Sequence, residues 1–145
     1  MKSITANLML FPISEAISAN GDSYATIFME IDSRILMHML ESNEQRMFQF
    51  LDNLASIHDS SVRFETIRAL PDFDRLFLRI MLVIADMQHD TRYFEIQYSS
   101  QKDLNRKIFL FLKNSYIECK EYHNQTGMDM LSNVKNHVEL IRSFF

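Results

Sequence analysis

The sequence PDFDRLFLRIMLVIADMQ, residues 71–88, is the longest largely apolar stretch of the chain. Its apolar residues occupy almost the whole circumference of a helix, which is typical of a helix buried on most sides. Arg75, Arg79 and Asp86 recur at helical spacing, and we expect them to form a narrow polar stripe near water. Pro71 suits a first helical position. The run is too short, and too often interrupted by charge, to span a bilayer, so it predicts a helix at the centre of a core.

The rest of the chain predicts amphipathic helices. Apolar residues recur at every third or fourth position, and capping or breaking residues bound each segment. In one of these segments the recurring apolar positions include Ile31, Ile35 and Met39. Residues 42–45 have the form of a capping box, with Ser42 at the cap. The predicted helices cover residues 14–20, 24–40, 42–57, 62–70, 104–123 and 128–145.

Two short segments fit this helical pattern less well. Residues 92–98 alternate apolar and polar side chains as a strand would, but no second strand is evident, so a short helix is predicted there. Residues 4–11 are apolar and precede Pro12, which favours a short first turn or a docking segment. The chain as a whole predicts an all-α fold of about seven or eight mostly antiparallel helices around the central helix at 71–88, in one compact domain spanning residues 1–145.

The composition excludes several kinds of active site. The chain has two glycines, two prolines and a single cysteine. Phosphate-binding loops and nucleophile elbows depend on glycine, so neither is expected. Cys119 cannot form an internal disulfide, and residues 1–11 lack the pattern of a signal peptide. Both features indicate a cytoplasmic protein.

Histidine and aspartate recur at the predicted connections between helices. In an up-and-down array, alternate connections share one end of the molecule, which would bring residues 20–22, 58–59, 89–90 and 123–127 together. Such a patch could bind a basic partner, hold a divalent metal or transfer protons. Helix capping and the helix dipole explain the same residues locally. Our candidate partner-binding residues are Asp22, His58, Asp59, Asp86, His89 and Asp90.

Metal and nucleic-acid sites have weaker support in the sequence. Cys119 and His123 lie one helical turn apart, but they supply two ligands where zinc needs three or four, so no metal or cofactor is expected. A basic row along residues 102–120 could follow a phosphate backbone, although acidic residues interrupt it. The row consists of Lys102, Arg106, Lys113 and Lys120.

These observations favour a protein that acts by contact and has no catalytic residues. The formal net charge is -4, with acidic residues in excess before residue 100, which favours a basic partner. In general character the chain is similar to small acidic helical proteins such as bacterial immunity proteins, antitoxins and secretion chaperones. The sharpest hypothesis is an immunity or antitoxin-type inhibitor of a basic toxin. A nucleic-acid-binding regulator that uses the row at 102–120 and a secretion chaperone are the alternatives.

Overall fold

The computed structural model describes residues 2–5, 31–91, 93–127 and 131–136 of the chain. Most of these residues are helical, so the predicted all-α class is confirmed. The number of helices in the whole chain stays a prediction, because the helix expected at 14–20 lies outside the described residues. Residues 131–136 are also helical. The other elements are β1 (Lys2–Thr5), α3 (Ser33–Ser42), α4 (Glu44–Ala55), α5 (Ser60–Arg68), α6 (Asp72–His89), β2 (Glu95–Tyr98) and α7 (Gln101–Thr126).

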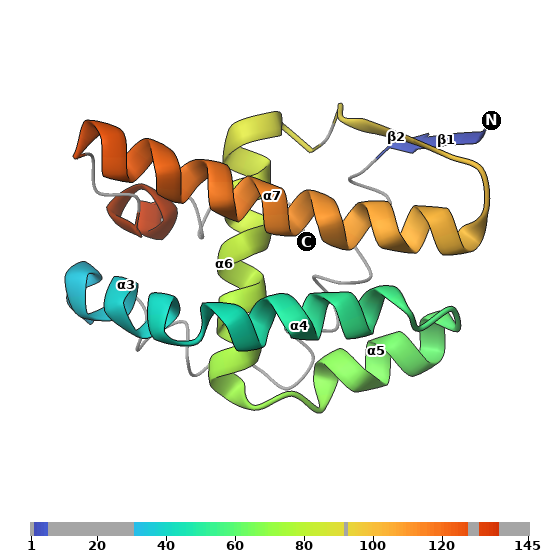
Figure 1. Cartoon of the computed structure of the whole chain (residues 1–145), viewed down its shortest axis with the longest axis horizontal. Helices are drawn as coiled ribbons and strands as arrows, with labels where there is room; N and C mark the ends of the chain where they lie inside the picture. Colours follow the sequence, from blue (N-terminus) through green and yellow to red (C-terminus); the bar gives the residue numbers. More distant parts are fainter. Residues whose placement is uncertain (1, 6–30, 92, 128–130, 137–145) are drawn as a thin grey trace.

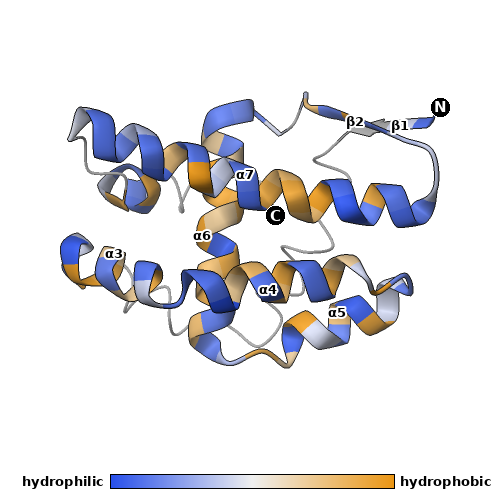
Figure 2. Cartoon of the chain, viewed as in Figure 1, coloured by the Kyte–Doolittle hydropathy of each residue, from blue (hydrophilic) through white to orange (hydrophobic). Residues whose placement is uncertain are grey.

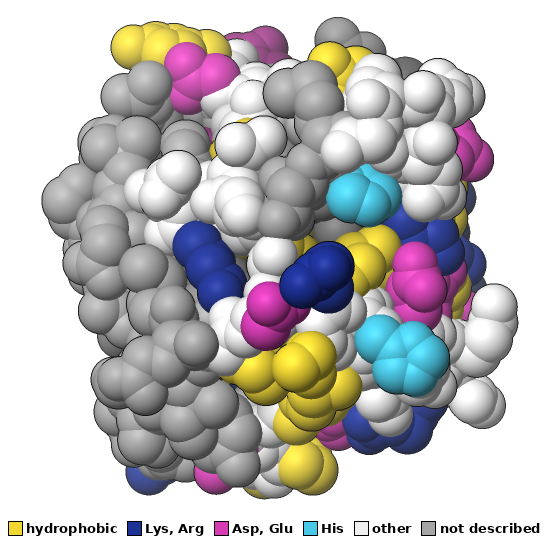
Figure 3. Space-filling model, turned by 90° about the vertical axis from the view of Figure 1, so that its left-hand side faces the viewer, with side chains coloured by type: hydrophobic (Ala, Val, Ile, Leu, Met, Phe, Trp, Pro, Cys, Tyr) yellow, Lys and Arg dark blue, Asp and Glu magenta, His cyan; other side chains and the backbone are white. Residues whose placement is uncertain are grey.

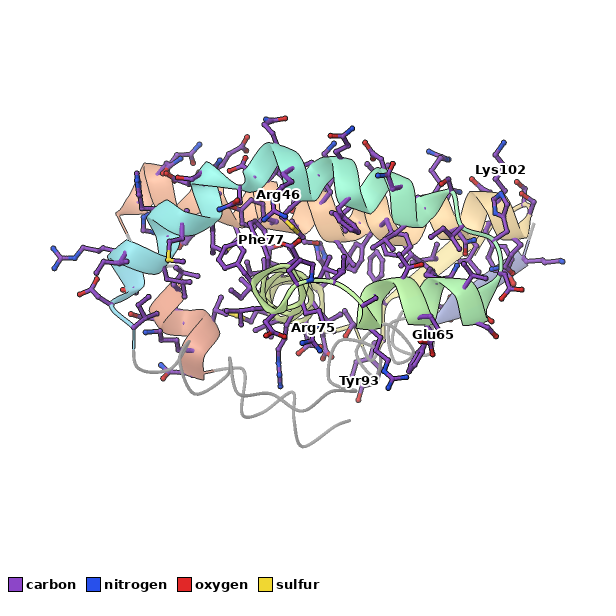
Figure 4. The ribbon with its side chains drawn as sticks, turned by 90° about the horizontal axis from the view of Figure 1, so that it is seen from below. Arg46, Glu65, Arg75, Phe77, Tyr93 and Lys102 are labelled. Carbon is purple, nitrogen blue, oxygen red and sulfur yellow. The ribbon has the colours of Figure 1, made fainter. Side chains whose placement is uncertain are left out.

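Two layers of helices make up the described part of the fold (Figure 1). Helices α3 and α4 follow one another along nearly one line, and α7 runs beside them in the opposite direction. Helix α6 crosses this layer at a steep angle, and the view from below shows it nearly end-on beneath α4 and α7 (Figure 4). The antiparallel arrangement predicted from the sequence therefore holds for α4 and α7, and it is wrong for α6.

Helix α6 is buried along most of its length. Every residue from Asp74 to Ala85 is buried, and the middle of the helix is mainly hydrophobic (Figure 2). This burial includes Arg75 and Arg79, which the sequence placed near water. Arg75 is paired with Asp72 one turn earlier in the helix. The expected polar stripe is therefore wrong at these two arginines, whose long side chains are covered by the fold.

Helix α3 begins later than the sequence predicts. Asp32 has an extended backbone, and its carboxylate accepts a hydrogen bond from the Arg34 amide at 2.8 Å, which caps a helix beginning at Ser33. The buried residues of α3 are Leu36 and Leu40. Ile35 is instead 56% exposed. Residues 31 and 32 therefore interrupt the helix predicted over 24–40, and residues 24–30 of that prediction lie outside the described residues.

The start of α4 also differs in detail from the prediction. Ser42 is the last residue of α3, and its hydroxyl donates to the His38 carbonyl at 2.8 Å instead of capping α4. Of the residues that the spacing predicts to face inward from α4, Met47, Phe48, Leu51 and Leu54 are buried, whereas Phe50 is half-buried.

Residues 95–98 form a strand, so the short helix predicted for 92–98 is wrong. Strand β2 pairs antiparallel with β1, and Ile4 lies opposite Ile96. The two strands are about 90 residues apart in the sequence, which explains why no partner was evident. Lys107 of α7 donates to the Gln97 carbonyl at 2.8 Å and so ties the strand to the helical layer.

Helix α7 extends three residues beyond the predicted range 104–123 at each end, from Gln101 to Thr126. The Ser100 side chain caps its first turn by accepting from the Asp103 amide, and Gly127 ends it with a left-handed backbone of φ 71°. Most contacts between described helices involve α7, which packs on both α4 and α6. Lys120 of α7 donates to the Glu44 carboxylate of α4 at 2.6 and 2.8 Å.

Candidate functional site

The outer side of α5 forms an open apolar groove. Of the nine residues of α5 only Ile67 is buried, and one face of the helix forms this groove together with Phe50 of α4 and the connection to α6. Its volume is about 730 Å³. Val62 is 53% exposed there. We call this surface the α5 groove, and it is lined by Phe50, Ser61, Val62, Glu65, Thr66, Ala69, Leu70 and Pro71.

Few polar groups of the groove are available to a ligand. The Thr66 hydroxyl donates to the Val62 carbonyl within α5, at 2.7 Å. Glu65 is exposed and has Arg68 at 3.6 Å, a surface ion pair of the kind that contributes little to stability. Figure 4 shows Glu65 on the side of α5 that faces away from α4 and α7. The α5 groove therefore combines an apolar floor with an accessible carboxylate.

Two of the predicted site residues lie at one end of the α5 groove. The Asp59 carboxylate accepts hydrogen bonds from the amides of Ser61 and Val62, at 2.8 and 3.2 Å, and so caps α5 as predicted. His58 precedes it and is exposed. Arg63 follows, and its guanidinium donates to the Ile57 carbonyl at 3.0 Å. Burial lowers the pKa of Arg63.

Three other predicted residues lie together at the end of α6. Asp90 has a left-handed backbone, with φ 44°, and its amide donates to the Asp86 carbonyl at 2.9 Å. The Asp86 carboxylate accepts from the Thr91 hydroxyl at 2.7 Å. His89 packs against the ring of Phe111 in α7, with centroids 5.1 Å apart. These contacts hold the connection between α6 and β2 against α7.

The structure does not bring all the predicted connections to one end of the molecule. Figure 1 shows the α4–α5 connection, the end of α6 and the end of α7 on three different sides. The prediction assumed that successive helices run antiparallel, so that alternate connections share one end of the molecule. It is wrong because α6 crosses the other helices. Asp22 lies outside the described residues, so its place relative to the others stays a prediction.

The basic row along α7 is divided between solvent and the neighbouring helix. Lys113 lies 5.1 Å from the centre of the Phe48 ring in α4. Lys120 forms the ion pair with α4 described above. Arg106 is exposed and bonds to Asp103 at 2.9 Å, and Lys102 lies near the start of α7 (Figure 4). Two of the four cations thus face α4, which weakens the case for a continuous phosphate-binding surface.

A second hollow, which we did not predict from the sequence, lies between α3 and the end of α7. We call it the α3–α7 pocket; its volume is about 470 Å³. Figure 3 shows this side of the molecule, with two histidine side chains near hydrophobic and charged groups. The spacing of Arg34, His38 and Glu41, at i, i+4 and i+7, was the available signal. The lining residues are Ser33, Arg34, Met37, His38, Glu41, His123, Gly127 and Leu131.

The described residues hold no group of three or more His, Cys, Asp or Glu side chains placed to bind a metal ion. Burial raises the pKa of the Cys119 thiol, which disfavours its reactive thiolate form. Tyr116 is buried beside Glu44, and burial and that carboxylate both raise its pKa.

Comparisons with known proteins add no family to this description. The chain matches no family model, no curated protein and no solved structure. Within the described residues, none of the helices has the length and apolar character needed to cross a membrane.

Proposed function

We propose that the protein is a non-catalytic cytoplasmic module that binds another protein and regulates or neutralises it. The observation that carries this proposal is the α5 groove, an open apolar surface next to the exposed residues His58 and Asp59. Exposed apolar surface of this kind is typical of protein contact sites, where a buried side chain of the partner supplies much of the binding energy.

A basic partner fits the charges of the chain best. The net charge is -4, and Asp59 and Glu65 place carboxylates beside the α5 groove. An acidic surface speeds encounter with a basic protein and can cover its active groove. The most specific form of the proposal is therefore an immunity or antitoxin-type inhibitor of a basic toxin. Asp86, His89 and Asp90 would form a separate contact region, and the complete chain would have seven or eight helices around α6.

The proposal is tested by affinity purification of the tagged full chain from its native cells at several salt concentrations. We expect one protein to be retained in stoichiometric amount, and less of it to be retained as salt screens the charges. Retention of no protein at low salt, or of a partner whose binding is unaffected by salt, would count against a basic protein partner.

A further inference from the structure

The α3–α7 pocket has the size and polarity of a small-molecule site. Its volume, about 470 Å³, lies within the range of natural ligand pockets. It lies at the opposite end of the molecule from α5 (Figure 1). A ligand bound there is therefore independent of the protein contact proposed above.

One end of the pocket is electronegative. Glu41 contributes a carboxylate, and its charge is one of the causes that raise the pKa of Tyr116 nearby. Gly127 lines the opposite end of the pocket, near the start of α3, because α7 runs antiparallel to α3 and its Lys120 already lies beside Glu44. The carboxyl end of a helix carries a partial negative charge, which favours cations. The carboxyl end of α7 therefore helps to balance the charge of Arg34, and the end of the pocket that attracts a further cation is the one at Glu41.

The cation of the pocket lies away from this end and is already balanced. Arg34 and Glu41 are seven residues apart on α3, which separates them by about 10 Å along the helix. The Arg34 guanidinium lies 3.6 Å from the Asp32 carboxylate. The hydrogen bond from the Arg34 amide lowers the pKa of Asp32, which keeps that carboxylate charged.

The remaining lining suits the uncharged part of an organic cation. Met37 and Leu131 supply apolar contacts, and the thioether of methionine adapts to different shapes. His38 lines the same pocket, and an imidazole nitrogen that carries no proton accepts a hydrogen bond. An alkyl chain that ends in several N–H donors would match both kinds of contact.

We propose that the α3–α7 pocket binds an alkylguanidinium or alkylammonium group, with its charged head at Glu41 and its alkyl chain against Met37 and Leu131. The same group occurs on free small molecules and on the arginine and lysine side chains of proteins. The pocket is therefore expected to recognise the cationic group itself, and the probes used below distinguish a free small molecule from a protein side chain.

The test is titration calorimetry of the full chain with n-butylguanidinium and with n-butylurea, its uncharged isostere. We expect the cation to bind and the urea to bind at least about tenfold more weakly, since hydrogen bonds to charged groups are the stronger ones. Glu41→Gln should weaken binding of the cation about tenfold. Glu95→Gln, which removes an exposed carboxylate of β2 that lines neither hollow, should leave it unchanged.

A third probe, the blocked peptide Gly-Arg-Gly, identifies the source of the cation. Tighter binding of the peptide than of butylguanidinium indicates a protein side chain, and tighter binding of the free cation indicates a small molecule. Failure of both to bind would overturn the proposal. Equal binding of the urea, binding of butyrate in place of the cation, or an equal effect of Glu95→Gln would overturn it as well.

Discussion

The most buried charge in the described fold is the carboxylate of Asp74 in α6, whose residue is 1% exposed. Arg46 of α4 donates to both of its oxygens at 2.7 Å. Figure 4 shows Arg46 on the side of α6 that faces α4 and α7. A buried carboxylate is tolerated when it is fully paired, and it becomes costly when its partner is removed. This pair therefore fixes where α4 crosses α6.

Arg46→Met should lower the free energy of unfolding by about 2 kcal/mol at pH 7, because it leaves Asp74 buried without its cation. Urea unfolding followed by circular dichroism measures the change. Arg106→Met is the matched control, since its pair with Asp103 is exposed and should contribute under about 1 kcal/mol. Equal losses in the two variants would show that the Arg46–Asp74 pair has no special role.

The lowered pKa of Asp103 should make the stability of the fold depend on pH. The hydrogen bond from the Ser99 amide, helped by Arg106, lowers the pKa of Asp103 from 3.8 to about 2. A carboxylate whose pKa is lower in the folded state stabilises the fold above its unfolded pKa, and this contribution is lost as the pH falls through the folded value. Asp103→Asn should therefore be less stable than the wild type at pH 7, and the difference should vanish between about pH 4 and pH 2.

Urea unfolding at pH 7, 4, 3 and 2 measures this difference. Asp52→Asn, at an exposed position of α4, controls for the loss of one negative charge. A stability difference between wild type and Asp103→Asn that stays constant down to pH 2 would contradict the role of the Ser99 hydrogen bond.

Among the elements, α6 contributes most to the core. Phe77 is fully buried and packs against Tyr116 of α7, with ring centroids 5.4 Å apart. Figure 4 shows it between α6 and the layer formed by α4 and α7. Phe77 of α6 thus packs directly on α7, and α7 also packs on α4. We therefore expect a cavity at Phe77 to weaken the packing of both α6 and α7.

Phe77→Ala should cost about 3 to 5 kcal/mol, because it leaves a cavity where α6 and α7 meet. Leu110→Ala, at a position of α7 that is 42% exposed, should cost less than about 1 kcal/mol. Thermal unfolding of both variants measures the difference. A small effect of Phe77→Ala would mean that α6 is not the main packing element.

Helix ends and helix faces could be predicted where they depend on residues that are close together in the sequence. Asp59 and Gly127 mark helix ends by their own chemistry, and the apolar face of α4 follows from its spacing. The strand at 95–98 could not be predicted, because its partner Lys2–Thr5 is distant in the sequence. The start of α3 directly after Asp32 was not predicted, because apolar residues recur at helical spacing on both sides of this cap.

At the scale of the whole molecule, the crossing of α6 decides which surfaces lie together. Alternation along the sequence placed His58 and His89 on one face, whereas the structure places the α4–α5 connection and the end of α6 on different sides (Figure 1). A crossing angle depends on how two side-chain surfaces fit, and the period of apolar residues does not contain that information. The α5 groove and the α3–α7 pocket are consequences of this packing.

Binding of a partner protein at the α5 groove is tested most directly by comparing Val62→Asp with Ile35→Asp. Both residues occupy the third position of a helix and are similarly exposed, but only Val62 lines the groove. With the partner recovered by affinity purification, calorimetry should show that Val62→Asp weakens binding at least about tenfold, since a charge on the apolar floor must be desolvated. Ile35→Asp should leave the affinity unchanged. Unchanged affinity in Val62→Asp, or an equal loss in both variants, would contradict the proposed contact.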